Sequence, residues 1–342
     1  MASTTRALAR ALRRQEHAIA EAVTDAFLAR HPDWVTRYGD RARAAGIEDA
    51  RYHVQFLSAA IEGDSPRAFE SYVQWTTRVL ESRGIEGRFL RENLAQVHEA
   101  AGALLSEEQR RVVARFFSWP EPHAPAEEPA GGAESPLALA RRMFVQSILQ
   151  GDRKAAMTVA TEALGGGATI EDLYSDVFQD ALYEIGLRWE RNAVTVAQEH
   201  MATAVTQFVM AHVFERIERT DARRGAALLT GVPGELHHVG AMMVADVLES
   251  RGWRVQFLGS NLPVPSIVAA VRDARPDVLG VSVTMLFNAH HAAGLIEAVR
   301  GLNQPVRIVV GGAAFRVANQ WQATGADAYA PDVRAAVAML CA

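Results

Sequence analysis

Apolar residues recur at steps of three and four throughout residues 1–118, which is the spacing of an amphipathic helix. The pattern breaks at His31-Pro32, over residues 63–66 and at Gly84, where proline or glycine ends a helix. After the second break, one helix face carries Phe69, Tyr72, Val73, Thr76, Val79 and Leu80. We therefore predict an all-helical N-terminal domain over residues 1–118.

The next stretch, residues 119–135, is rich in proline, alanine and glutamate and offers too little large apolar surface to pack a core. Its composition predicts a linker. Helical spacing resumes over residues 136–223, where Gly165-Gly166-Gly167 ends one helix. Thr169 and Asp172 predict a capping box at the start of the next helix. Four helices of about 10 to 20 residues fit this region.

Beyond residue 224 the pattern changes to short apolar runs that alternate with helical stretches. The runs occupy residues 226–231, 253–259, 277–283, 306–312 and 326–330. Four of them are almost uniformly apolar, which is typical of parallel strands with helices on both faces of the sheet. Residues 224–342 therefore predict a Rossmann-like domain with a five-stranded parallel sheet, and the fold class is α + α/β. Ligands of such sheets bind at the carboxyl ends of the strands.

The composition limits the environment and the partners. No run approaches the roughly 18 apolar residues of a membrane span, and Arg13, Arg14 and Glu16 interrupt the apolar positions that a signal peptide would need. We expect a cytoplasmic protein without a membrane partner. The only cysteine, Cys341, excludes an internal disulfide and a cysteine-based zinc site. A net charge of -5 gives no overall electrostatic reason to bind nucleic acid.

The loop after the first predicted strand contains candidate chemistry. Residues 231–240 read GVPGELHHVG, with neither the G-x-G-x-x-G spacing of a dinucleotide site nor a Walker lysine. His237 projects from a turn that glycine permits, and the carboxylate of Glu235 can hydrogen-bond one of its ring nitrogens. Such a carboxylate fixes the imidazole tautomer and raises its basicity toward a metal. The neighbouring His238 is expected just before the following helix, facing elsewhere.

Three elements of this domain resemble the signature of B12-binding domains, D-x-H-x-x-G, S-x-L/T and GG. They are Glu235-x-His237-x-x-Gly240, Ser282-Val283-Thr284 and Gly311-Gly312. The resemblance implies that His237 is the lower axial ligand to the cobalt of a corrinoid. It also implies that the serine segment faces the channel of the displaced base and that the glycines let the nucleotide tail approach closely. Glu235 replaces the aspartate of the signature, as in some light-responsive members of the family.

A second motif lies in the predicted four-helix region, where Trp189 is followed after nine residues by Glu199-His200. It resembles the W-x9-E-H pattern in the helical cap of adenosylcobalamin-dependent photoreceptors related to the carotenoid-gene repressors. The resemblance implies that the tryptophan lies beside the upper ligand and the Glu-His pair near the adenosyl group. Residues 192–194 predict a helix break between them. The alternative is that Trp189 is bundle core and His200 a buried, satisfied histidine.

One position departs from those photoreceptors. Glu190 stands where the repressors have the histidine that captures cobalt after light breaks the cobalt–carbon bond. The departure puts that photoadduct in doubt for this chain, and His200 is the candidate replacement.

The N-terminal domain shows neither a strand wing nor a concentrated basic recognition helix, so we expect no DNA binding. A helical domain joined to this cap and B12 domain resembles the photocobilins, which combine adenosylcobalamin with a bilin. Residues suited to a planar dianionic tetrapyrrole are Trp34, Tyr38, Tyr52, His53, Phe56, Phe69, Tyr72, Trp75, His98, Arg78, Arg83, Arg88 and Arg91. The same residues would also furnish an ordinary helical core with a basic edge. Because Cys341 is the only thiol, biliverdin would be bound non-covalently.

The sequence thus predicts an adenosylcobalamin photosensor, with biliverdin as a candidate second chromophore and without catalytic turnover. The expected partners are these chromophores together with a second copy of the chain or an effector protein. The alternative is a corrinoid shuttle of a methyltransferase system, which would share the cap and the His237 loop but has no need of W-x9-E-H. A third interpretation is a helical interaction protein whose B12 domain has lost its ligand.

Overall fold

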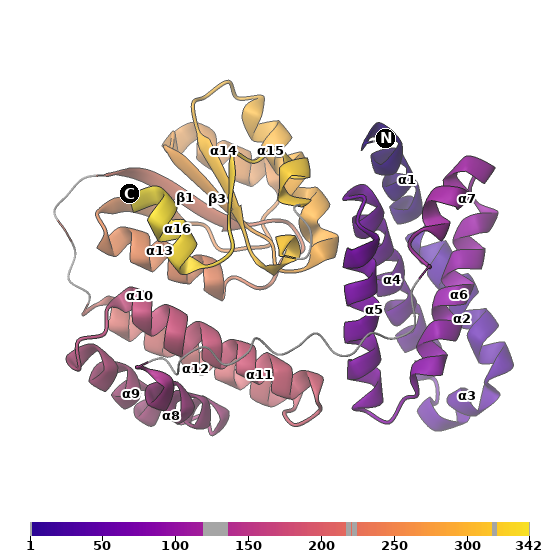
Figure 1. Cartoon of the computed structure of the whole chain (residues 1–342), viewed down its shortest axis with the longest axis horizontal. Helices are drawn as coiled ribbons and strands as arrows, with labels where there is room; N and C mark the ends of the chain where they lie inside the picture. Colours follow the sequence, from indigo (N-terminus) through magenta and orange to yellow (C-terminus); the bar gives the residue numbers. More distant parts are fainter. Residues whose placement is uncertain (1, 119–135, 217–219, 221–223, 317–319, 342) are drawn as a thin grey trace. The chain divides into compact units, whose positions relative to one another are not determined.

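The computed structural model describes residues 2–118, 136–216, 220, 224–316 and 320–341 (Figure 1). These residues form two compact units, an N-terminal helical unit and a C-terminal unit that contains a helical cap and a sheet domain. The linker predicted over residues 119–135 lies outside the described residues. The predicted domain boundaries stay predictions.

The N-terminal unit is helical throughout its described residues, as the apolar spacing predicted. Its helices are α1 (Ala2–Arg14), α2 (Glu16–Arg30), α3 (Pro32–Tyr38), α4 (Arg41–Glu62), α5 (Pro66–Glu81), α6 (Gly87–Ala103) and α7 (Glu107–Ala114). The predicted breaks therefore separate α2 from α3, α4 from α5 and α5 from α6. Leu8, Val23, Leu57 and Leu94, from four different helices, are buried in its core.

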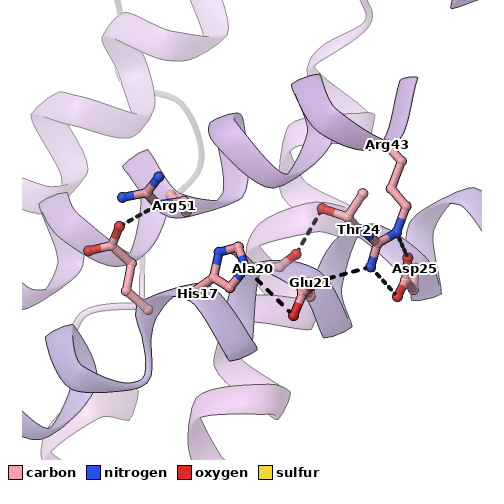
Figure 2. A network of polar contacts seen from close by, with 8 residues as sticks. His17, Ala20, Glu21, Thr24, Asp25, Arg43 and Arg51 are labelled. Atoms are coloured by element: carbon pink, nitrogen blue, oxygen red, sulfur yellow. Dashed lines mark hydrogen bonds and ion pairs between the residues drawn. The ribbon is translucent and has the colours of Figure 1, made fainter. Parts of the chain in front are cut away.

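Ion pairs join α2 and α4 along their solvent-exposed edge (Figure 2). Arg43 donates to Asp25 at 2.7 Å and to Glu21 at 3.3 Å. Elsewhere on the same two helices, Arg51 of α4 donates to Glu16 of α2 at 2.7 Å. Exposed pairs of this kind contribute about 1 kcal/mol or less each. The apolar core between the helices, rather than these pairs, therefore holds the unit together.

The cap contains the four helices that the sequence predicted. They are α8 (Ala138–Leu149), α9 (Arg153–Gly165), a long cap helix formed by α10 (Ile170–Asp172), a π-helical segment η1 (Leu173–Gln179) and α11 (Asp180–Glu190), and α12 (Val196–Phe214). The predicted capping box is present, because the Thr169 hydroxyl accepts from the Asp172 N–H and the Asp172 carboxylate accepts from the Thr169 N–H. Phe144, Tyr174 and Phe178 pack in the cap core with no exposed surface.

The sheet domain contains five parallel strands in the order β2-β1-β3-β4-β5. The strands are β1 (Gly225–Gly231), β2 (Trp253–Phe257), β3 (Val278–Ser282), β4 (Arg307–Gly311) and β5 (Ala328–Ala330). The helices between and after them are α13 (Val239–Ser250), α14 (Val264–Ala274), α15 (Ala289–Arg300) and α16 (Val333–Cys341), with short 3-10 turns at η2 (Leu286–Asn288), η3 (Ala313–Phe315) and η4 (Gln320–Thr324). The predicted fold class is confirmed.

Alternate strand residues face opposite helix layers. Leu228 and Leu279 pack with α14 and α15 on one face, whereas Ala227 and Leu229 pack with α13 and α16 on the other. Because both faces are covered, nearly uniform apolar strands are the stable choice.

Helices α13 and α16 lie between the sheet and the cap (Figure 1). Met243 and Val247 of α13, together with Val333 of α16, belong to the same apolar cluster as the cap core. At this junction the Tyr174 hydroxyl donates to Asp246 Oδ2 at 2.8 Å. Cap and sheet domain therefore share a core.

Candidate functional site

Three loops meet at the carboxyl edge of the sheet. Gly231 at the end of β1 pairs with Ser282 at the end of β3, and Ser282 pairs with Gly311 at the end of β4. The His237 loop (residues 232–238), the β3 loop (residues 283–288) and the β4 loop (residues 312–316) are therefore neighbours. This is the edge at which parallel α/β sheets bind ligands.

Glu235 and His237 form a hydrogen-bonded pair on the first of these loops. His237 Nδ1 donates to Glu235 Oε1 at 2.6 Å, and the His237 backbone N–H donates to the same oxygen at 3.0 Å. The Glu235 side chain is fully buried, whereas the His237 side chain is 59% exposed. The carboxylate is thus a fixed internal group that orients an accessible imidazole.

The β3 loop holds the other oxygen of Glu235. Oε2 accepts from the N–H groups of Thr284 at 2.9 Å and Met285 at 3.0 Å. Burial by itself raises the pKa of Glu235, but hydrogen bonds from His237 and the β3 loop outweigh it and lower the pKa to about 2. Glu235 is therefore anionic and tied to two loops at once.

The pKa of His237 depends on groups of both the sheet domain and the cap. Its hydrogen bond with Glu235 raises the pKa of His237, burial opposes that shift, and the Glu199 carboxylate of the cap adds a smaller increase. Glu199 therefore lies close enough to His237 for the two charges to interact. Within the described residues, His237 Nε2 makes no hydrogen bond. Because Nδ1 is occupied, Nε2 is the nitrogen that is open to a metal.

Two asparagines that the sequence reasoning missed support this loop. Asn288 is 3% exposed and donates through Nδ2 to Glu235 Oε2 at 3.3 Å. Asn261, in the loop after β2, accepts from the Gly234 N–H at 2.9 Å. Gly234 has a φ of 77°, and a Cβ there would lie 3.0 Å from the Asn288 amide oxygen. In the sequence, each of the two asparagines is recognisable only as a polar residue in a loop that follows a strand.

The glycines of the third signature element have a structural role that needs no ligand. Gly312 has a φ of 98°, and a Cβ at this position would lie 2.1 Å from the carbonyl oxygen of Val283. A Cβ on Gly311 would lie 3.2 Å from the Ala330 carbonyl oxygen. A Cβ on Gly240, by contrast, would meet no atom within 4 Å. Close backbone packing accounts for Gly312, whereas Gly240 borders open space.

The cap carries its motif at two helix ends. Trp189 is half-buried near the end of α11, while Glu199 lies in the first turn of α12 and His200 directly follows it. The predicted break is confirmed, because Asn192 between the helices has a φ of 57°. The His200 side chain is 75% exposed and its Nδ1 donates to Glu199 Oε2 at 2.6 Å. The alternative of a buried His200 is therefore wrong.

Exposed apolar side chains occur beside these motifs. They are Leu187 on α11, Val196 on α12 and Leu236 beside His237. Exposed apolar side chains at such positions in the sequence suit a surface that a ligand covers.

His238 hydrogen-bonds to the cap and to its own loop. Gln207 Nε2 on α12 donates to His238 Nε2 at 2.7 Å, and His238 Nδ1 donates to the Leu236 carbonyl at 3.0 Å. Both ring nitrogens of His238 are therefore engaged. Of the two adjacent histidines, His237 is the one with a nitrogen left for a ligand.

No group of three or more His, Cys, Asp or Glu side chains in the described part of the chain could hold a metal ion. One imidazole is too few ligands to retain a free transition metal. The exposed Nε2 of His237 suits a metal whose other ligands arrive with it, such as an ion inside a macrocycle. The apolar surroundings suit such a macrocycle.

Two family profiles, each described as a B12 binding domain, match the chain. One matches residues 225–338, which form the sheet domain, and the other matches residues 140–213, which form the cap. Together they cover more than half of the chain. This chain belongs to the B12-binding family. Cobalamin is the cofactor that both domains indicate.

The relatives of this B12-binding protein include a transcriptional repressor and corrinoid proteins. The HTH-type transcriptional repressor CarA of Myxococcus xanthus is 29% identical over 246 residues, which are 70% of this chain and 78% of the repressor. The dimethylamine corrinoid protein of Methanosarcina barkeri is 29% identical over 160 residues, 45% of this chain and 74% of that protein. The predicted resemblance to the B12-binding photoreceptor family is confirmed by the domain profiles and the match to the repressor.

A solved structure agrees with the fold. The monomethylamine corrinoid protein of Methanosarcina barkeri aligns with a TM-score of 0.53 at 20% identity, covering 60% of this chain and 98% of that one. Among the described residues, no helix combines the length and apolar content needed to cross a membrane. The roles of the individual site residues in this B12-binding protein stay predictions.

Proposed function

We propose that this B12-binding protein is a light sensor that holds adenosylcobalamin between its cap and its sheet domain. The Glu235–His237 pair at the carboxyl edge, within electrostatic reach of Glu199 on the cap, carries the proposal. Adenosylcobalamin, when bound, supplies a cobalt–carbon bond that visible light breaks. The residues below would bind, orient and cover that group.

His237 is the proposed lower ligand. Its Nδ1 proton is held by the buried Glu235 carboxylate, so the lone pair of Nε2 is the one presented to cobalt. Glu235 in turn cannot rotate freely, because the β3 loop holds its second oxygen. The pair therefore fixes both the tautomer and the direction of the ligand.

The cap residues would cover the upper side. Trp189 and the Glu199–His200 pair lie at helix ends, beside exposed apolar side chains that a large ligand would bury. Loss of the upper group would leave a space beside Trp189, and packed interfaces respond to such spaces by switching arrangement. Glu190 is buried, so the exposed His200 is the cap side chain that would be available to hold the metal in its place.

A methyl shuttle between methyltransferases is the second candidate. The similarity to a dimethylamine corrinoid protein favours it. The shuttle has no evident use for Trp189 with Glu199 and His200, because a methyl group leaves little to cover. Preference for the adenosyl form would therefore speak for the sensor, and equal retention of both forms for the shuttle.

Biliverdin is proposed as a second chromophore, bound without a covalent link. In the N-terminal unit the rings of Trp34, Tyr38 and Phe89 form a cluster with centroid separations of 5.2 to 5.3 Å, and Arg88 stacks on Phe89 at 4.8 Å. Several other residues of the predicted set are core instead, since His53, Phe56, Phe69 and Tyr72 are buried. The accessible aromatic cluster with its arginine is the part that suits a planar dianion.

The deciding experiment is an absorption spectrum of the protein with adenosylcobalamin, before and after green illumination. A histidine-ligated dark spectrum that converts on illumination supports the sensor. Rapid methyl exchange between added methyl donors and acceptors through the protein, with no preference for the adenosyl form, would instead establish the shuttle.

A further inference from the structure

The cap and the sheet domain are joined by contacts that differ in burial. The base of the junction lies near the start of the long cap helix, where fully buried Tyr174 donates to Asp246 at 2.8 Å. Met243 and Val247 of α13 pack into the cap core around it. A buried apolar junction with an internal hydrogen bond is costly to open, because the hydrogen bond would be lost and apolar surface would be exposed to water.

A second contact lies further along the same helix, in solvent. Arg316 Nη2 donates to the Tyr183 hydroxyl at 2.8 Å, and the guanidinium carbon lies 5.3 Å from the centre of the tyrosine ring. Tyr183 is 47% exposed and Arg316 is also exposed. Because this contact is partly exposed, it opens more easily than the buried base.

Arg316 is held on a rigid part of the site edge. It follows η3, in which Ala314 and Phe315 are buried, and that turn follows Gly312, which packs directly on the backbone of Val283. Arg316 also donates to the Pro331 carbonyl at 3.2 Å. The β4 loop therefore presents Arg316 in a fixed position.

Tyr183 lies between the base and the cap motif. It is nine residues beyond Tyr174, roughly 13 Å along the helix, and six residues before Trp189. A restraint at Tyr183 therefore acts between the buried base and Trp189, the residue proposed to cover the upper side of the cofactor.

We propose that Tyr183 and Arg316 form a clasp that closes the cap over the His237 loop and limits the rate at which a bound corrinoid leaves. The inference rests on the proposed cobalamin site. Neither clasp residue is a proposed ligand, so the clasp changes the rate of exit and leaves the lower ligation of the metal intact.

The test compares Tyr183→Phe, Arg316→Gln and the double variant with the unaltered chain. Adenosylcobalamin dissociation in the dark is followed by its absorption spectrum after transfer into excess scavenger. Each single variant should release the cofactor about three- to tenfold faster, which is the effect of losing one hydrogen bond. The double variant should be no faster than the faster single variant, because both changes remove one shared contact.

The matched control is Arg272→Gln on α14 of the sheet domain. The Arg272 side chain is 59% exposed and pairs with the neighbouring Asp273 at 3.3 Å, so the same substitution is made at an exposed arginine whose partner is on its own helix. Its release rate should equal that of the unaltered chain. Amide exchange of the cofactor-free protein over residues 183–190 gives a second readout and should be faster in the clasp variants alone.

The outcomes separate the clasp from the proposed function. If the unaltered chain does not bind cobalamin, both the proposed function and the proposed clasp are wrong. Histidine-ligated binding with unchanged release and unchanged exchange in all three variants overturns the clasp alone. Faster release in Arg272→Gln as well would show a general loss of stability and also overturn the clasp.

Discussion

At the scale of single residues, the imidazole of His237 owes its orientation to groups that are distant in sequence. Glu235, its direct partner, accepts hydrogen bonds from Thr284 and Met285, about fifty residues further along the chain. A carboxylate fixed by several donors orients its partner more firmly than a side chain free to rotate. The orientation of Nε2 therefore depends on two loops, the His237 loop and the β3 loop.

Replacing His237 by alanine should remove the lower ligand of cobalamin. The absorption spectrum of the bound cofactor should change from the histidine-ligated form to one without a protein ligand, and retention should weaken at least tenfold. Absorption spectroscopy after gel filtration measures both effects. His238→Ala is the neighbouring control, because its ring nitrogens bond to Gln207 and Leu236. An unchanged His237→Ala spectrum would remove His237 from the site.

A second prediction concerns Asp246 at the base of the cap junction. Burial raises the pKa of Asp246 to about 6 from an ordinary 3.8, Tyr174 opposes the rise and Glu249 adds to it. Between pH 3.8 and 6 the folded state binds more protons than the unfolded state, so stability falls as pH rises through that window. The penalty is fully present above pH 6.

Asp246→Asn keeps an acceptor for the Tyr174 hydroxyl but removes the charge. The free energy of unfolding of this variant at pH 7.5 should exceed that of the unaltered chain by roughly 1 to 3 kcal/mol, with little difference at pH 4. Denaturant unfolding at both pH values measures it. Asp273→Asn, in which an exposed carboxylate is replaced, is the control. The same pH dependence in Asp246→Asn and the unaltered chain would contradict the prediction.

The sequence predicted part of the site at this scale. The Glu235–His237 contact followed from a spacing of two residues in a glycine-containing turn, and the structure contains it. Asn288 could not be found in that way, because it binds across 53 residues and no periodic pattern links the two loops. The donors at Thr284 and Met285 are backbone N–H groups, which every non-proline residue possesses.

At the scale of helices and strands, local signals predicted most elements. The five apolar runs match the five strands to within a few residues at each end, and the Thr169–Asp172 capping box begins the long cap helix as predicted. The π-helical segment within that helix was not predicted. Its backbone pattern depends on how Tyr174 and Phe178 pack, and tertiary packing leaves no period in the sequence.

The residues at the helix ends of the cap lead us to predict that the protein retains one form of cobalamin better than another, according to its upper group. The unaltered chain should retain adenosylcobalamin better than methylcobalamin, and Trp189→Ala should reduce that ratio about tenfold through the loss of a large packing surface. Dissociation rates of both cofactors in the dark measure the ratio. Trp34→Ala, in the N-terminal unit, is the control, because it makes the same substitution in a different unit. Equal retention of both cofactors by the unaltered chain would favour the methyl shuttle.

At the scale of the whole molecule, the proposed sensor needs an output other than turnover. Light should change the assembly state or the domain arrangement of the adenosylcobalamin-loaded chain, because loss of the upper group alters packing at the cap. Size-exclusion chromatography and small-angle scattering, in darkness and after illumination, are the measurements. The His237→Ala variant under the same light is the control. Complete photolysis with no change in shape or assembly would contradict the prediction.

A further prediction separates the two proposed chromophores. A chain that lacks residues 1–118 should lose the red absorption of bound biliverdin while it retains cobalamin, because the accessible aromatic cluster belongs to the N-terminal unit. Absorption spectra of both chains with each chromophore make the test. Arg88→Ala in the full chain should weaken bilin binding without loss of the fold. Full bilin binding by the shortened chain would place the site elsewhere.

The hydrogen bond between Asn288 and Glu235 also bears on synthesis. The two residues are separated by 53 positions, which a ribosome takes about 3 to 11 s to translate at typical speeds. During that interval Glu235 lacks the donors of the β3 loop, and the neighbouring imidazole has no fixed direction. A nascent chain halted before residue 284 should therefore be unable to hold cobalamin through histidine, which restricts loading of the cofactor to a chain whose third strand has already emerged and paired.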